Sequence, residues 1–390
     1  MRITSVTVLA ALAAALSAAP ADASLAAQSE RIASCMQDAA ASLGFSGTVY
    51  ARHGNLIVER SFGTSDAAGE VPNSSRTRFN IGSANKMFIA IAIGRLVDRG
   101  VLQFDAPIGR YLPGLKPEFA DITIAQLLDH TSGLGDYFRP ENHAAIEAAK
   151  TATDLLPLAL ASPPAFQPGS KRSYSNSGFI VLGAVIEKVS GETWAAFIQQ
   201  EILDPIGMTD TRLDSVGGAT PMSRMSPEGK LDKPRPALGP VLASPAGGMF
   251  STPSDLSRLL TAVFGGRLLS KATLAVLLTP RPDPAGGPGT FGYGFVIREK
   301  PTSKVGIGGG APGVNADVAY FPESGWQLVA LSNFDPPVAT QMNRVLEQAV
   351  FSEDGPSACA AALADPKLRT PPVILIGPGG GRDAPVKPQG

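Results

Sequence analysis

The segment Phe79-Asn80-Ile81-Gly82-Ser83-Ala84-Asn85-Lys86 decides the fold. A serine stands where a helix is expected to begin, and a lysine follows three residues later, so both side chains share one helical face. We expect this helix over residues 84–99, with Gly100 as its C-terminal cap. Phenylalanine, isoleucine and alanine occupy nearly every side of it, which predicts a helix that is buried all round.

Ser83 and Lys86 are the candidate nucleophile and base. The positive end of the helix dipole at Ser83 favours an attacking alkoxide. Burial of Lys86 against an apolar helix disfavours its charged form and lowers its pKa towards the range of a general base. The alternative is an N-capping serine followed by a solvent-exposed lysine, and the four-residue pattern alone does not decide between the two.

The sequence around this segment predicts an α+β fold. Strands are expected where β-favouring runs alternate with turns, and helices where apolar residues recur every three or four positions. An antiparallel sheet follows, flanked by N- and C-terminal helices that meet, with a mostly helical insertion. The expected helices are at about 25–43 and 338–351, and the expected strands are at 47–52, 56–62, 293–298, 305–310, 314–321 and 326–332.

We divide the chain into a sheet-containing lobe, a helical lobe and a tail. Residues 24–100 and 281–352 are expected to form a discontinuous α/β lobe, and residues 101–280 the helical lobe. Residues 353–390 are rich in proline and glycine, so we expect a disordered tail.

The N-terminus predicts export. Arg2 precedes an apolar run from Val6 to Ala19, and Ala21-Asp22-Ala23 offers a cleavage site, which is typical of a signal peptide over residues 1–23. The alternative is a buried N-terminal helix. We expect a periplasmic or extracellular protein with no membrane-spanning segment in its mature chain.

Composition excludes several partners and cofactors. The formal net charge of −1 gives no electrostatic reason to expect nucleic acid or an anionic membrane. There is no H-E-x-x-H motif and no cysteine cluster, so we expect no metal or other cofactor, and a small-molecule or peptide-like substrate as the partner. The oligomeric state is not predicted.

The two cysteines, Cys35 and Cys359, lie near opposite ends of the chain. They could form a disulfide in an oxidising compartment, or each could be a small buried hydrophobic residue. The sequence barely separates these possibilities, and we favour the disulfide.

A set of motifs in fixed order gives the chain a family resemblance. Together they resemble the superfamily of class C β-lactamases, penicillin-binding DD-peptidases and family VIII-type esterases, over about residues 30–350. The motifs are Ile81-Gly82-Ser83-x-x-Lys86, Leu127-Leu128-x-His130-Thr131-Ser132-Gly133-Leu134, Tyr174-Ser175-Asn176-Ser177-Gly178, Pro205-x-Gly207-Met208, Ala246-Gly247-Gly248-Met249 and Gly308-Gly309-Gly310-Ala311-Pro312-Gly313.

The resemblance implies the β-lactamase/DD-peptidase fold and a role for each matching position. Ser83 would be acylated, while Lys86 and Tyr174 would share proton transfer. Asn176 would bind the substrate, and the main-chain N–H groups of Ser83 and Gly310 would form the oxyanion hole. The substrate-binding positions implied in this way are Asn176, Gly308, Gly309 and Gly310.

One position departs from the family pattern. The third motif of the family begins with lysine, histidine or another polar or aromatic residue, and the register set by Tyr320-Phe321-Pro322-Glu323 places Ile307 there. Lys304 lies three residues too early, and a three-residue shift along a strand reverses the facing side. A carboxylate-bearing substrate would therefore lack a cationic partner at this position.

Three functions follow from these observations. The first is a serine hydrolase, esterase- or amidase-like, that prefers neutral acyl groups. The second is a β-lactamase or a D-alanyl-D-alanine carboxypeptidase with the same catalytic residues. The third is a catalytically impaired binding module, which the replacement at Ile307 favours.

Overall fold

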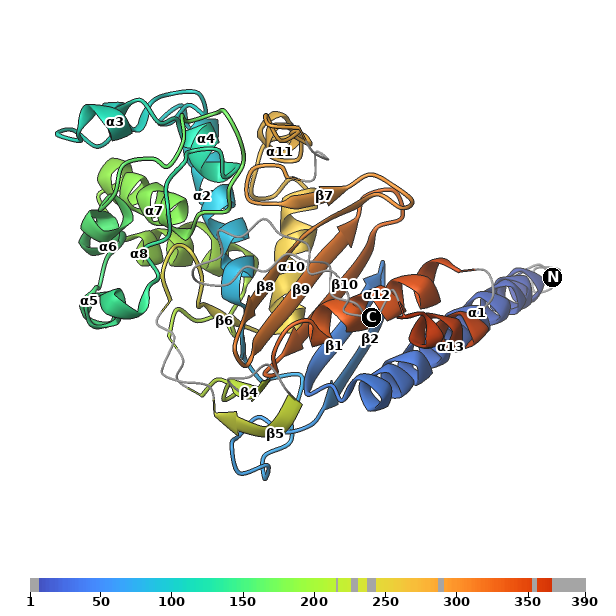
Figure 1. Ribbon diagram of the computed structural model, residues 1–390. Coiled ribbons are helices and arrows are strands. Elements are labelled where there is room, and N and C mark those ends of the chain that lie inside the picture. The colour runs from blue at the N-terminus through green and yellow to red at the C-terminus, as the bar shows by residue number, and fades with distance from the viewer. Residues whose placement is uncertain are drawn as a thin grey trace.

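The computed structural model describes residues 7–214, 217–225, 231–236, 243–286, 291–352 and 356–366. Its centre is a six-stranded sheet in the order β2-β1-β10-β9-β8-β7 (Figure 1). Neighbouring strands all run antiparallel, as the sequence predicts. The strands are β1 (Gly47–His53), β2 (Leu56–Phe62), β7 (Val296–Arg298), β8 (Lys304–Ala311), β9 (Val314–Phe321) and β10 (Trp326–Ser332).

Two further strand pairs lie outside this sheet. Strand β3 (Phe79–Asn80) pairs with β6 (Phe250–Ser251) immediately before the predicted nucleophile. Strand β4 (Met222–Met225) pairs with β5 (Leu231–Pro236).

Helices from the two ends of the chain cover one face of the sheet. They are α1 (Thr7–Leu43), α12 (Val338–Phe351) and α13 (Pro356–Ala364), and they lie side by side in Figure 1. Ile32, Met36 and Ala39 recur at helical spacing along α1 and are buried against Met342 and Leu346 of α12. This packing confirms that the terminal helices meet on the sheet.

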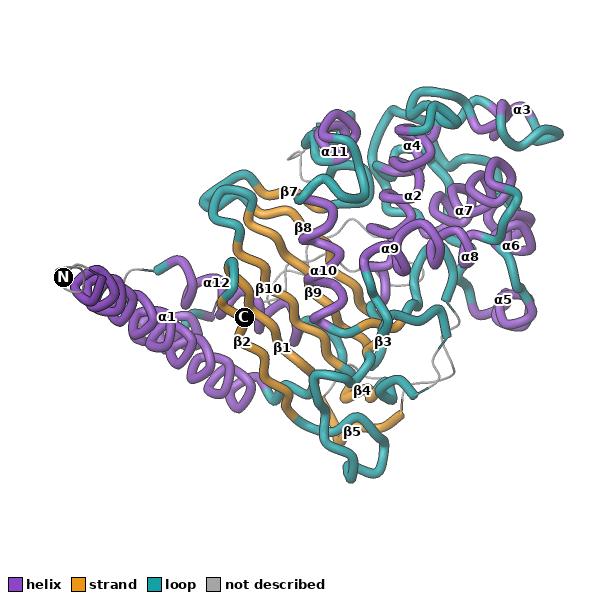
Figure 2. The backbone as a smooth tube through the Cα atoms, turned by 180° about the vertical axis from the view of Figure 1, so that it is seen from behind, coloured by secondary structure: helices purple, strands orange, loops and turns teal. Residues whose placement is uncertain are grey.

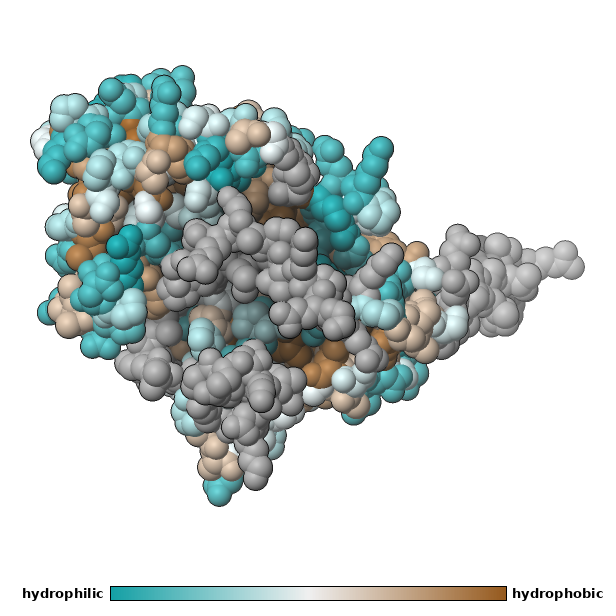
Figure 3. Space-filling model, in the orientation of Figure 1, coloured by the Kyte–Doolittle hydropathy of each residue, from teal (hydrophilic) through white to brown (hydrophobic). Residues whose placement is uncertain are grey.

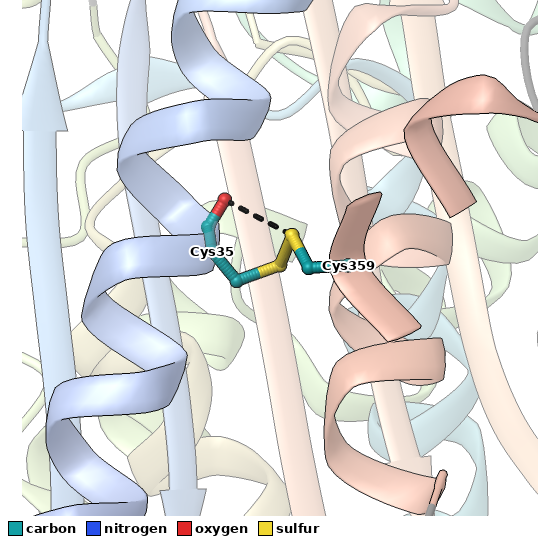
Figure 4. Close-up of a disulfide and its surroundings, with 2 residues drawn as sticks. All are labelled: Cys35 and Cys359. Carbon is teal, nitrogen blue, oxygen red and sulfur yellow. Dashed lines mark hydrogen bonds between the residues drawn. A yellow bond between two sulfur atoms is a disulfide. The ribbon is translucent and has the colours of Figure 1, made fainter. Parts of the chain in front are cut away.

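The disulfide is present in the structure. Cys35 of α1 and Cys359 of α13 are bonded, with their Cα atoms 5.7 Å apart (Figure 4). The bond therefore closes a loop across nearly the whole chain.

The expected disordered tail is wrong for its first part. Pro356–Ala364 forms helix α13, and Ala358, Cys359 and Ala362 bury one side of it. The physical reason is an alanine-rich sequence of high helix propensity that the disulfide attaches to α1. Residues 367–390 lie outside the described part of the chain.

Helix α1 begins at Thr7 rather than near residue 25. It therefore runs through the segment expected to be a signal peptide, because alanine and leucine there favour helix. Within the described part of the chain, no helix has the length and apolar character needed to span a bilayer.

The opposite face of the sheet packs against helix α10 (Pro253–Phe264) and the turn that carries Ser83. Helix α10 contacts β1 and β10 there and crosses the sheet in the view from behind (Figure 2). It lies within the range expected for the helical lobe, so part of that range packs on the sheet. The division at residues 100 and 280 stays a prediction.

The remaining helices form the helical lobe beside the sheet. Hydrophilic side chains predominate on its outer surface, and hydrophobic ones are visible in the recess between lobe and sheet (Figure 3). The α-helices are α2 (Lys86–Asp98), α3 (Pro117–Ala120), α4 (Ile124–Leu128), α5 (His143–Ala148), α6 (Ala152–Ala159), α7 (Asn176–Ser190), α8 (Trp194–Ile198), α9 (Asp204–Ile206) and α11 (Lys271–Leu277). The 3₁₀ helices are η1 (Gly82–Asn85), η2 (Ile108–Arg110) and η3 (Pro140–Asn142), and η4 (Gln199–Leu203) is a π-helix.

The predicted boundaries are confirmed for β9, β10 and α12. Two predictions need correction. The helix expected over 84–99 begins with the 3₁₀ turn η1, and α2 itself starts at Lys86. Strand β7 starts at Val296 rather than at residue 293, because Gly294 has a φ of 73° that breaks an extended strand.

Candidate active site

The turn η1 presents Ser83 beside strand β8. Gly82 has a φ of 50°, and its N–H donates to Oδ1 of Asn80. A Cβ atom on Gly309 would lie 1.9 Å from the carbonyl oxygen of Ile81 and 2.9 Å from the nitrogen of Ser83. Glycine at this position therefore allows the two main chains to approach each other, so the backbone of β8 lies directly against the nucleophile turn.

Three predicted catalytic side chains meet at the Ser83 hydroxyl. Oη of Tyr174 donates to Ser83 Oγ at 2.8 Å, and Nζ of Lys86 lies 3.3 Å from the same oxygen. Tyr174 comes from the loop before α7, and Lys86 from the first turn of α2. The structure therefore brings together the serine, lysine and tyrosine from two separate motifs.

Lys86 is fully enclosed, with 1% of its surface exposed. Its Nζ donates to Oδ1 of Asn176 at 2.8 Å and also to the carbonyl oxygen of Ala246. Burial lowers the pKa of Lys86 from 10.5 to about 7, while the charge of Asp136 acts in the opposite direction. The expected desolvation of this amine is therefore present, and a neutral amine is accessible near neutral pH.

The hydrogen bonds of Lys86 suit both protonation states. An ammonium can donate three hydrogen bonds, to Asn176, Ala246 and Ser83. A neutral amine keeps two donors for Asn176 and Ala246, and its lone pair then points at the Ser83 hydroxyl. Loss of the Lys86 proton therefore converts the contact with Ser83 from donation into acceptance.

Tyr174 has the opposite acid–base character. Burial raises the pKa of the Tyr174 phenol, and the hydrogen bond with Ser83 only partly opposes this effect. The phenol is therefore neutral and donates a hydrogen bond, so Lys86 is the group of the two that can accept a proton near neutral pH.

His130 supports the tyrosine loop. Its ring packs against Tyr174 in a tilted arrangement with centroids 4.4 Å apart, and its Nδ1 accepts from the N–H of Ser175 at 3.2 Å. Burial and then the charge of Lys86 lower the pKa of His130 to about 3, so the ring is neutral. Its backbone has a φ of 63°, a conformation that non-glycine residues rarely adopt.

Asn176 is the first residue of α7, whose N-terminus Ser175 caps by accepting from the N–H of Gly178. The two ends of its amide have different partners: Oδ1 faces Lys86, and Nδ2 donates to Asp136 at 2.8 Å. Our reading of the sequence missed Asp136. It follows the His130-Thr131-Ser132-Gly133 motif by three residues, and that proximity is the signal that marks it.

The loop that carries Ala246 is fixed from two sides. Nδ2 of Asn85 donates to the carbonyl oxygens of Ser244 and Pro245 at 2.9 and 3.1 Å. The hydroxyl groups of Tyr137 and Ser244 lie 2.9 Å apart. Asn85, the neighbour of Lys86 in sequence, therefore holds the loop whose Ala246 carbonyl contacts Lys86.

Strand β8 runs beside the turn η1, with Gly309 and Gly310 against it. Gly308 precedes them in the same strand, and a substrate-binding role for the three glycines stays a prediction. Ile307 packs against the core on the α2 side, opposite Val318 of β9. Lys304 faces the other way, with Nζ 3.5 Å from Asp317. The expectation that Lys304 cannot replace the missing polar residue of the third motif agrees with this geometry.

Comparison with known proteins gives a consistent picture. The Beta-lactamase family model matches residues 32–351. The putative penicillin-binding protein PbpX of Bacillus subtilis is 30% identical over 74% of this chain and 70% of its own length. Esterase EstB of Burkholderia gladioli is 33% identical over 65% of this chain and 76% of its own length.

Solved structures agree with these matches. A penicillin-binding protein from Bacillus halodurans superimposes with a TM-score of 0.72 at 30% identity, covering 81% of this chain and 99% of that protein. The D-amino acid amidase of Ochrobactrum anthropi gives a TM-score of 0.67 at 25% identity, covering 79% and 92%. This chain therefore belongs to the Beta-lactamase family and is a serine hydrolase with the fold of the penicillin-binding proteins.

Proposed function

We propose that this hydrolase cleaves an ester or amide through an acyl-enzyme formed on Ser83. One observation carries the proposal: the Ser83 hydroxyl contacts both an amine of lowered pKa and a neutral phenol. The amine serves as the base and the phenol as the acid, so each proton transfer has its own group.

In acylation, Ser83 Oγ attacks the substrate carbonyl carbon while its proton passes to Nζ of neutral Lys86. When the bond to the leaving group breaks, the phenol of Tyr174 gives that group a proton and regains one from Lys86. The products are the acylated serine, the free alcohol or amine, and the catalytic groups in their starting protonation states.

In deacylation, water takes the place of the leaving group. Lys86, with Tyr174 as relay, accepts a proton from the water as its oxygen attacks the acyl carbon. Collapse of the tetrahedral intermediate breaks the bond to Ser83 Oγ, which recovers its proton, and the carboxylic acid departs. We assign the main-chain N–H groups of Ser83 and Gly310 to the oxyanion hole, where one such donor lowers the barrier by about 3–4 kcal/mol.

The residue at position 307 supports a preference for neutral acyl groups. Ile307 offers neither charge nor proton where the family carries a polar residue, and Lys304 is engaged with Asp317 and Glu347. The relatives include an esterase and a D-amino acid amidase by name. The second candidate, a β-lactamase or D-alanyl-D-alanine carboxypeptidase, is favoured by the relatives named penicillin-binding proteins.

We also propose that the protein is exported after removal of residues 1–23. The charge, apolar run and cleavage site at the N-terminus support this, and so does the disulfide, because disulfides persist in oxidising compartments. N-terminal sequencing of the protein recovered from the medium or periplasm would test it, with a mature start at residue 24 as the expected result.

The catalytic proposal is tested with a fluorophosphonate probe followed by mass spectrometry. Wild type should gain the probe mass on Ser83, and Ser83→Ala should gain none. Turnover of a short p-nitrophenyl ester should exceed turnover of a β-lactam, and equal rates would contradict the neutral-acyl preference. A folded wild-type protein that takes no label would favour the binding-module alternative.

A further inference from the structure

We propose that Asp136 is a positioning residue that fixes the orientation of Asn176 and, through it, the placement of the Lys86 amine. The inference rests on the proposed function, since Lys86 is the base in that reaction. Asp136 makes no hydrogen bond to Ser83 or Lys86, so its positioning effect passes through the Asn176 amide, while its charge acts on Lys86 directly.

The orientation of Asn176 depends on the chemistry of its two partners. An ionised carboxylate accepts hydrogen bonds and cannot donate, so Asp136 Oδ2 selects the NH₂ end of the amide. The oxygen end is then directed at Lys86 Nζ, 2.8 Å away. A rotated amide would place its oxygen against the carboxylate and its N–H groups against the lysine. Asp136 therefore excludes the orientation in which Lys86 loses its acceptor.

The two carboxylate oxygens of Asp136 have different partners, so only one of them accepts a hydrogen bond from Asn176. Oδ1 of Asp136 accepts from the N–H of Phe138 at 2.9 Å, which leaves Oδ2 for the amide. The residue before it is also fixed, because the Ser175 hydroxyl donates to the carbonyl oxygen of Gly135 at 2.9 Å. The carboxylate thus lies on a loop that is attached to the N-terminus of α7.

Asp136 also supplies a charge that no other group near Lys86 replaces in the site described here. Tyr174 and His130 face the amine from the neighbouring loops, and both are neutral. Burial lowers the pKa of Lys86, whereas the negative charge of Asp136 opposes that lowering. Removal of this charge while the fold is kept should therefore lower the pKa of the base further.

The test compares wild type with Asp136→Asn and a matched control, Asp121→Asn. Asp121 is an exposed aspartate in the same lobe, at the end of α3. An asparagine at 136 has one acceptor oxygen for two N–H groups, so the Asn176 amide can rotate. We expect kcat for a p-nitrophenyl ester to fall about tenfold. In a plot of kcat/KM against pH, the rise on the acidic side (the acidic limb) should move to lower pH by roughly one pH unit. Asp121→Asn should change neither quantity.

Asp136→Glu provides the conservative variant. It keeps the charge, so its acidic limb should stay at the wild-type position even where kcat is lower. If Asp136→Asn does not fold, Asp136→Ser must show the same displacement of the limb. An unchanged limb in the folded, uncharged variants would overturn the proposal, because a merely structural role lowers the rate without moving the profile.

Fluorophosphonate labelling separates this proposal from the function on which it rests. Wild type that takes no label on Ser83 overturns both. Wild type that is labelled and active, with an Asp136→Asn variant indistinguishable from it, overturns the positioning role alone.

Discussion

The two faces of the central sheet bury side chains of different chemistry. Towards α1, α12 and α13, the core contains apolar residues such as Met36 and Leu346, and the disulfide joins the helices. The carboxylates buried there, Asp317 and Glu347, have Lys304 or Arg298 as ion-pair partners. Towards α2, the protein also buries Ser83, Lys86 and His130. Burial of an amine costs free energy that burial of a methionine does not. The terminal face therefore stabilises the fold, whereas the face towards α2 gives up stability by burying an amine whose pKa is lowered.

Replacement of Lys86 by methionine should separate the two faces most clearly. We expect kcat/KM to fall at least about 10⁴-fold, since the base is lost while the side-chain volume is nearly kept. The free energy of unfolding should change by less than about 2 kcal/mol, because relief of the buried amine offsets the hydrogen bonds lost at Asn176 and Ala246. Ester hydrolysis and urea unfolding measure the two effects.

The matched control on the terminal face is Met36→Ala. Met36 is fully buried, so its truncation should lower the free energy of unfolding by about 2–5 kcal/mol and leave kcat/KM of the folded protein unchanged. A Lys86→Met variant that is as unstable as Met36→Ala would contradict the contrast between the faces.

Removal of the disulfide should have the next largest effect. The Cys35→Ala/Cys359→Ala variant should unfold with a free energy about 2–4 kcal/mol lower, because the bond closes a loop with a sequence separation of 324 residues. Kinetic constants at 25 °C should match wild type, since both cysteines lie on the terminal face. Denaturant titration with and without a reductant measures the effect. If thiol titration verifies that the disulfide is reduced and the wild type is equally stable with and without the reductant, the predicted stabilisation by the disulfide is wrong.

The pH dependence of hydrolysis should report Lys86 alone among the catalytic groups. Its neutral form is the base, and its pKa is about 7, so kcat/KM should rise with pH through that value. At pH 5 the rate should be about 100-fold below the plateau near pH 8, because each pH unit below the pKa removes about nine-tenths of the free amine. Burial raises the pKa of Tyr174, so this phenol should add no alkaline limb below pH 9.

The same shift has a consequence for stability. Between pH 7 and 10.5 the unfolded chain keeps a proton on Lys86 that the folded protein has lost. The contribution of this residue to the free energy of unfolding therefore rises with pH across that window. Lys86→Met should lack the slope, whereas the double cysteine variant should keep it. A rate that is flat between pH 5 and 8 would contradict both arguments.

Local pattern accounts for what the sequence predicted well. Strands β9 and β10 and helix α12 have clear periodicity and turn signals at their ends, and their boundaries were predicted correctly. The Ser83–Lys86 pair is local too, since one helical turn joins the residues. Tyr174 was identified only through the family resemblance, because 91 residues separate it from Ser83.

Tertiary contacts account for what the sequence did not predict. The hydrogen bond between Asp136 and Asn176 joins a loop to the first residue of α7, 40 residues later, and neither residue type requires the other as its partner. Helix α13 was mistaken for disordered tail because proline and glycine dominate the residues that follow it. Its alanines are buried only because α1 and α12 lie beside it. In both cases the deciding partner is distant in sequence.

The smallest expected effect concerns the substrate rather than the base. Ile307→Lys would add a cation on the catalytic side of β8, where the family carries a polar residue. A charge-assisted hydrogen bond of about 1–2 kcal/mol corresponds to a gain of roughly tenfold in kcat/KM for a carboxylate-bearing ester over its neutral analogue. Ile307→Met, uncharged and similar in volume, is the control and should leave the ratio between the two esters unchanged. If both variants shift the ratio equally, shape rather than charge at position 307 sets the preference.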